Sequence, residues 1–147
     1  SPEQVLYSRA ALLLRNGKVV DVDGISPVAI GNASGSFYLA ILHRNHLGIM
    51  SANPITGGVY DMRNQQAVYV QTSRTNPPVH VVNGNAMMIQ GDASSDNQVN
   101  SLDLGAVMLM YFNIGQTNSD INMDGVTNSI DVARSFQSYF EQAHLPK

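Results

Sequence analysis

The sequence predicts an α+β protein in which an N-terminal antiparallel β-sandwich packs against a C-terminal pair of loop–helix repeats. Three observations predict this class. Asn-Gly pairs flanked by apolar runs occur in the first 90 residues, carboxylates gather in the last third of the chain, and a segment of helical length follows each carboxylate-rich loop. We therefore divide the chain into a β-sandwich domain at residues 1–90 and a repeat domain at residues 91–147.

The N-terminal part has the pattern of short strands joined by tight turns. Asn16-Gly17 and Asn83-Gly84 each lie between two apolar runs. Both residues of such a pair tolerate positive φ, which a two-residue hairpin turn requires. Ser36–Leu42 is apolar on both faces, as expected for a covered central strand. Short strands at regular spacing favour a sandwich over a helical or βαβ fold.

The C-terminal part contains an internal duplication. Seven residues recur at an offset of 28 in one register. Self-similarity of this kind is the signature of a repeated supersecondary unit. The matched pairs are Asp92 and Asp120, Asp96 and Asp124, Asn100 and Asn128, Ser101 and Ser129, Asp103 and Asp131, Tyr111 and Tyr139, and Phe112 and Phe140.

Each repeat ends in a segment that predicts a helix, over about 102–112 in the first and about 130–143 in the second. Ser101 and Ser129 are the expected N-caps. The first helix has no charged residue from Leu104 to Phe112. Because a helix that is apolar on all sides requires burial, we expect it to pack against the β-domain.

Each repeat opens with the pattern of a calcium-binding loop. Calcium takes six to eight oxygen ligands, and a 12-residue loop supplies them from positions 1, 3, 5, 7, 9 and 12, with a backbone carbonyl at position 7. In the loop at 120–131, these positions hold Asp120, Asn122, Asp124, Val126, Asn128 and Asp131. In the loop at 92–103, they hold Asp92, Ser94, Asp96, Gln98, Asn100 and Asp103.

The residue at position six favours the second loop. Gly125 adopts the required positive φ at no steric cost, whereas Asn97 stands there in the first loop. Ser94 is also a shorter ligand than Asn122. We expect two Ca²⁺ sites, the second tighter than the first. The alternative for each loop is an Asx-rich turn that only caps the following helix.

Composition and motifs point away from several function classes. The chain has no Cys and only two Glu, and it contains no nucleophile elbow, phosphate loop or dinucleotide fingerprint, so we expect no catalytic residues and no enzyme activity. A net charge of -3 with scattered basic residues argues against nucleic acid as a partner. No apolar run reaches the roughly 18 residues that membrane insertion requires. His43 and His46 would face opposite sides of a strand, which disfavours a zinc site.

These motifs resemble two known families. The paired loop–helix units, over about residues 91–143, are similar to the duplicated calcium-binding F-hand repeats of dockerins and dockerin-like modules. Arg9–Val28 and His43–Met50 resemble a β-module near the C-termini of large secreted bacterial surface proteins, of the haemagglutinin or adhesin kind, in which dockerin-like repeats follow. The resemblance implies an extracellular, secreted or cell-surface, structural or adhesive role.

Two functions stay open at this point. The first is a structural subunit or module of a cell-surface or filamentous assembly, whose partner is another copy of the chain or another surface protein. Val5–Leu14 would supply an unpaired terminal strand, apolar on one face, for strand addition. The second is a module that recognises a partner protein or a glycan in a calcium-dependent way.

Overall fold

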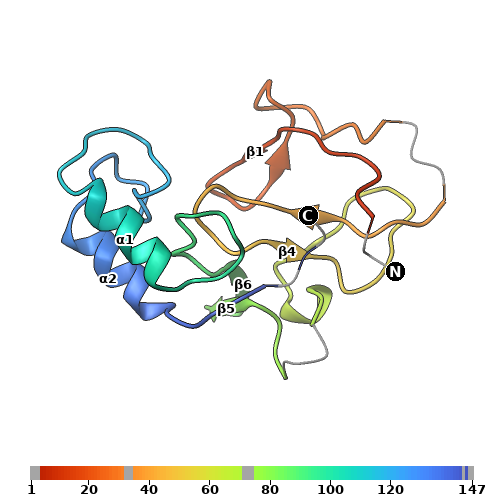
Figure 1. Ribbon diagram of the computed structural model, residues 1–147. Helices are drawn as coiled ribbons and strands as arrows, with labels where there is room; N and C mark the ends of the chain where they lie inside the picture. The colour runs from red at the N-terminus through yellow and green to blue at the C-terminus, as the bar shows by residue number, and fades with distance from the viewer. Residues whose placement is uncertain (1–3, 32–34, 71–74, 144, 146–147) are drawn as a thin grey trace.

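The computed structural model describes residues 4–31, 35–70, 75–143 and 145, and it has a mixed fold of helices and small antiparallel sheets. Two helices lie at one end of the molecule, and the strands and their loops form the rest (Figure 1). The general α+β prediction is confirmed. The predicted sandwich is not: the described residues form three separate two-stranded sheets.

The second Asn-Gly pair makes the longest hairpin. β5 (Val79–Val82) pairs with β6 (Asn85–Met88) in antiparallel register. Asn83 and Gly84 form the turn with φ of 50° and 78°. These positive values are the reason that Asn and Gly occupy the turn, and this hairpin prediction is confirmed.

The first Asn-Gly pair also turns a hairpin, but its strands are short. β1 (Leu12–Leu13) pairs with β2 (Val19–Val20), and Gly17 in the turn has φ 82°. All residues from Gln4 to Leu13 are exposed. A sandwich needs a second sheet that covers such apolar residues, and the described residues place none over this segment.

The third sheet belongs to a larger ribbon. β3 (Ala40–Ile41) pairs with β4 (Ile49–Met50), and an isolated bridge joins Ser51 to Val68 on the opposite side of β4. The chain just after the short 3-10 helix η1 (Gln65–Ala67) therefore completes the ribbon. The expected central position of Ser36–Leu42 is wrong, since β4 lies in the middle. Ile49, Met62 and Val68 form the buried cluster of this region.

A short ladder joins the N-terminal part to the first repeat. The N–H of Leu47 donates to the carbonyl of Ile89 at 2.7 Å, beside a bridge between His46 and Gln90. This ladder leads directly into the loop at 92–103. A second buried cluster then crosses residue 90, so the two predicted domains share a core. Its members are Leu47, Ile89, Val99 and Ala143.

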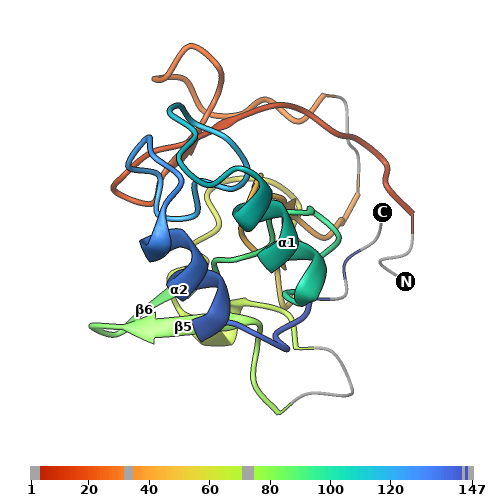
Figure 2. The same ribbon diagram turned by 60° about the vertical axis from the view of Figure 1, so that its left-hand side comes forward.

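The helices are α1 (Ser101–Leu109) and α2 (Ser129–Gln137), which lie side by side (Figure 2). Both end earlier than the sequence predicts. Three residues beyond each helix, Phe112 and Phe140 have φ of 69° and 73°. This left-handed conformation cannot continue a right-handed helix, and it turns the chain back toward the opposite repeat.

The predicted burial of α1 against the β-domain is wrong. Leu102, Met108 and Leu109 are 65%, 65% and 86% exposed. The side chain of Val107 is fully buried, and it packs with Ala93 and residue 121 between the helices and the loops. α1 packs on α2 and the loops along one narrow stripe, so its remaining apolar side chains face outward.

Candidate functional site

The two helices begin with the same capping box. Asn100 and Asn128 are the N-caps, in place of the expected Ser101 and Ser129. In each box the Asn side chain accepts a hydrogen bond from the helix, and an Asp three residues later accepts one from the cap N–H. The latter distance is 2.7 Å for Asp103 and 2.8 Å in the second repeat. The reciprocal bonds satisfy two backbone donors, which a serine cap alone would not do.

The second loop is organised by its first and last carboxylates. Asp120 accepts hydrogen bonds from the N–H groups of Asp124 and Gly125 at 3.1 and 3.0 Å. Asp131 accepts one from the N–H of Asn122 at 3.1 Å. Asp120 and Asp131 are fully buried. Position 12 is therefore held over position 3, which closes the loop into a ring.

The first loop repeats this arrangement atom for atom. Asp92 accepts hydrogen bonds from the N–H groups of Asp96 and Asn97 at 3.0 and 2.9 Å. Asp103 accepts one from the N–H of Ser94 at 2.9 Å. The residues at positions 3 and 6 differ between the two loops, yet the hydrogen bonds to positions 1 and 12 are the same. The backbone and the carboxylates thus define the geometry.

Positions 5 and 7 are also placed alike. The carboxylate of Asp124 accepts from the N–H of Val126 at 2.9 Å, and that of Asp96 accepts from the N–H of Gln98 at 2.9 Å. The carbonyl of Val126 accepts a hydrogen bond from the Asn128 side-chain amide at 3.2 Å. The two rings therefore match in the hydrogen bonds that their carboxylates at positions 1, 5 and 12 accept.

Left-handed backbone occurs at the same two positions of each loop. At position six, Asn97 has φ 66° and Gly125 has φ 89°. The positive φ expected for Asn97 is confirmed. At position four, Ser95 and Met123 both have φ 60°. Sequence reasoning missed position four, because neither side chain has the local preference for this conformation that Asn and Gly have.

The loops concentrate negative charge. Among the described residues, no Arg or Lys forms an ion pair with a loop carboxylate. Burial raises the pKa of the Asp92 carboxyl above its ordinary value, and the nearby Asp103 and Asp96 add to this effect. In the same part of the chain, no three His, Cys, Asp or Glu side chains gather closely enough to hold a metal by themselves. Each carboxylate oxygen that accepts one N–H still has a second lone pair.

The two repeats hold each other through exchanged backbone bonds. The N–H of Phe112 donates to the carbonyl of Thr127, and the N–H of Phe140 donates to the carbonyl of Val99, both at 2.8 Å. Residues 99 and 127 are the equivalent position eight of each loop. This exchange gives the pair a local two-fold symmetry, and it explains why both aromatic residues adopt positive φ.

The two histidines come together because the chain leaves the extended conformation between them. The rings of His43 and His46 make an edge-to-face contact with centroids 4.6 Å apart. Burial, together with the smaller effects of the neighbouring His43 and Arg44, lowers the pKa of the His46 imidazole to about 4. His46 is therefore neutral at pH 7. Arg44 and Asn45 lie between the two histidines; Arg44 is hydrogen-bonded to the first loop and Asn45 to the second, and neither was anticipated from the sequence.

No protein-family model, curated protein or solved structure matches this chain.

Proposed function

We propose that each loop binds one Ca²⁺ ion and that the protein is a non-catalytic structural module stabilised by calcium. The observation that carries the proposal is one carboxylate arrangement built twice on different side chains. Asp92 and Asp120 stand at position 1 of the two rings, and Asp103 and Asp131 stand at position 12. A turn that served only to cap a helix would not need three acids in each loop.

The donor chemistry favours calcium among the common metals. The two loops contain carboxylate, amide, hydroxyl and carbonyl oxygens and no His or Cys. Oxygen-only sets suit hard cations, whereas zinc prefers nitrogen and sulfur. Mg²⁺ keeps several waters and demands a strict octahedron, while Ca²⁺ accepts six to eight oxygens in flexible geometry. Loops that offer six ligand positions each therefore match Ca²⁺ best.

The ion would act as a folding element. Buried carboxylates without cationic partners repel one another and cost desolvation energy, which a bound cation offsets. An ion at about a hundred times its dissociation constant stabilises the folded state by roughly 2.7 kcal/mol per site. That is a substantial fraction of a typical total of about 5–15 kcal/mol. Extracellular calcium modules work at dissociation constants of about 0.1–1 mM, which agrees with a secreted or cell-surface setting.

The exposed N-terminal segment supports a role in assembly. Val5, Leu6 and Tyr7 are 51%, 71% and 47% exposed, and they precede the free edge of β1. An apolar segment beside a strand edge is a template for strand addition by a second copy. Deletion of residues 1–8 should reduce the size of the assembled species in light scattering at constant calcium. Identical assembly of the truncated chain would exclude this segment as the joint.

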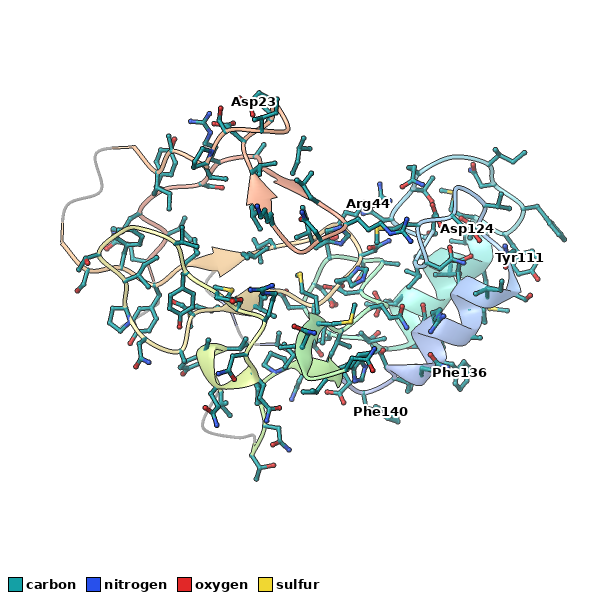
Figure 3. The ribbon with its side chains drawn as sticks, turned by 180° about the vertical axis from the view of Figure 1, so that it is seen from behind. Asp23, Arg44, Tyr111, Asp124, Phe136 and Phe140 are labelled. Carbon is teal, nitrogen blue, oxygen red and sulfur yellow. The ribbon has the colours of Figure 1, made fainter. Side chains whose placement is uncertain are left out.

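A second candidate function is a dockerin-like or adhesin-like binding module. Leu109, Phe112 and Phe140 are 86%, 80% and 84% exposed, which is unusual for large apolar side chains on one end of a molecule. A groove between the helices is lined by Met108, Tyr111, Ser129 and Val132. Figure 3 shows Phe136 and Phe140 projecting from this end. A monomer that captures a protein or glycan only in calcium would favour this candidate over self-assembly.

Circular dichroism and thermal unfolding test the calcium proposal. We expect the helical signal and the melting temperature to fall in chelator and to recover in millimolar Ca²⁺, because the loops hold α1 and α2 in place. Millimolar Mg²⁺ serves as the matched control and should restore less. An identical melt in chelator and in calcium would show that the helices are held by packing alone.

A further inference from the structure

We propose that Arg44 and Asn45 position the two loops relative to each other and couple their cation binding. This inference rests on the proposed function of the loops. Both residues lie in the connection between β3 and β4, outside the repeats. Figure 3 shows Arg44 reaching from the strands toward the helical end of the molecule, where Asp124 lies.

Asn45 is hydrogen-bonded to the first residue of the second loop and to the residue that precedes the first loop. It is fully buried, and its side-chain amide donates to the backbone carbonyl of Asp120 at 2.7 Å. Its own backbone carbonyl accepts from the N–H of Gly91 at 2.9 Å. Gly91 immediately precedes Asp92. One residue of the β-part is thus bonded to position 1 of the second loop and to the entry of the first.

Hydrogen bonds link Arg44 to position four of the first loop directly and to position four of the second loop through Gln116. Its carbonyl accepts a hydrogen bond from the Ser95 hydroxyl at 2.9 Å. Its guanidinium donates to the side chain of Gln116 at 2.5 Å, and the amide of Gln116 donates to the carbonyl of Met123 at 3.2 Å. Ser95 and Met123 are the equivalent left-handed residues. Arg44 is therefore hydrogen-bonded directly to the first loop and is connected to the second loop through Gln116.

These ties give a physical route for coupling. An ion that contracts the second loop moves the Asp120 backbone, and the buried Asn45 carries this displacement to Gly91 and Asp92. Coupling of this kind is reciprocal, so each ion should raise the affinity for the other by the same factor. Residues that hold metal ligands from behind typically change metal affinity by about 10–100-fold when they are removed.

The experiment measures calcium affinity loop by loop. Asp96→Asn leaves the second loop as the competent site, and Asp124→Asn leaves the first, because Asn keeps the hydrogen-bond acceptor but removes the charge. In these backgrounds, Asn45→Ala should weaken the second loop by about tenfold and the first loop less. In the chain with both loops intact, Asn45→Ala should also abolish the dependence of one affinity on the other.

Asn85→Ala is the matched control. Its amide also donates to a backbone carbonyl, that of Asn83 at 3.3 Å, in the exposed β5–β6 hairpin. We expect both calcium affinities to be unchanged. A merely structural role of Asn45 would weaken the two loops equally, in step with the loss of thermal stability, and would overturn the proposal.

Two further variants change exposed side chains, so the test does not depend on whether Asn45→Ala folds. Ser95→Ala should weaken the first loop, and Gln116→Ala the second, each by about two- to threefold, the size of one weak hydrogen bond. Unchanged affinities in both variants, with two ions still bound, would refute the positioning role and leave the calcium function intact. Absence of calcium binding to the wild-type chain would instead refute the proposed function itself.

Discussion

The two loops have the same hydrogen-bonded ring but differ in the buried side chains that pack beside it. In the first repeat, Val99 and Val107 are buried apolar residues. In the second, Thr127 and Ser135 stand at the equivalent positions, and their buried hydroxyls have no hydrogen-bond partner among the described residues. The carboxylate geometry is the same in both. The ring is therefore maintained by backbone donors and carboxylates, and it tolerates a change in the core below.

The loops also differ in their relation to the β-part. Val99 of the first loop packs in a cluster with Leu47 and Ile89, so this loop shares a core with the strands. Thr127 stands at the equivalent place in the second loop, and it is a buried polar residue. The second loop is tied mainly by polar contacts, such as the bond from Asn45 to Asp120. We infer that apolar packing against the strands supports the first loop, whereas hydrogen bonds join the second loop to the β-part and its apolar support comes from Ile121, which packs with Ala93 and Val107.

Acidification should destabilise the protein, because protonation of the buried His46 imidazole is unfavourable in the folded state. The pKa of His46 is about 4 in the folded protein, below its ordinary 6.5, so the unfolded state binds more protons between these values. The contribution of His46 to the free energy of unfolding is then highest above pH 6.5, and it falls by up to roughly 3 kcal/mol as the pH approaches 4, at about 1.4 kcal/mol per unit. Urea unfolding against pH measures this. A His46→Gln variant with the same pH dependence would contradict the assignment.

Core substitutions should separate the repeats. Val107→Ala removes two buried methyl groups and should cost about 2 kcal/mol of unfolding free energy. Ser135→Ala removes an unpaired buried hydroxyl and should stabilise by about 1 kcal/mol. Chemical denaturation in calcium measures both. Equal losses in the two variants would mean that the repeats have equivalent cores.

Exchanging the residues at position six should reduce the difference in calcium affinity between the two loops. Asn97→Gly relieves a non-Gly residue at φ 66° and should strengthen the first loop, while Gly125→Asn at φ 89° should weaken the second. The expected change is about 0.5–1 kcal/mol in each direction, or roughly two- to fivefold in affinity. The gain at Asn97 is reduced by the loss of its bond from the Gly48 N–H. Calorimetry on the Asp96→Asn and Asp124→Asn backgrounds would detect the change in affinity. If the affinities of the two loops keep the same difference, backbone strain at position six is not the cause of that difference.

The sequence predicts the features that depend only on neighbouring residues. The Asn83-Gly84 turn, the repeat and the carboxylates at fixed spacing were all readable, because each depends on a few neighbouring residues. The N-caps were displaced by one residue, since Asn100 and Asp103 form a reciprocal box that outcompetes a single serine.

Long-range features had no such signal. The hydrogen bonds between Asn45 and Asp120 and between Arg44 and Ser95 join segments far apart in the chain. A side-chain amide can donate, and a backbone carbonyl can accept, almost anywhere, so neither residue has a local signal. The exposure of Leu109 was equally hidden, because an apolar helix has no polar side that marks its outer face. A strand of two residues such as β1 has no sequence pattern that indicates which other strands it joins.

The central claim is that both loops bind calcium, the second more tightly. Isothermal titration of the wild-type chain, Asp96→Asn and Asp124→Asn with Ca²⁺ tests it most directly. We predict two ions for the wild type and one for each variant, with the site retained in Asp96→Asn tighter by about 1 kcal/mol, the usual cost of a non-Gly residue at a position that favours glycine. No binding to the wild type, or a stoichiometry that neither substitution changes, would contradict the claim.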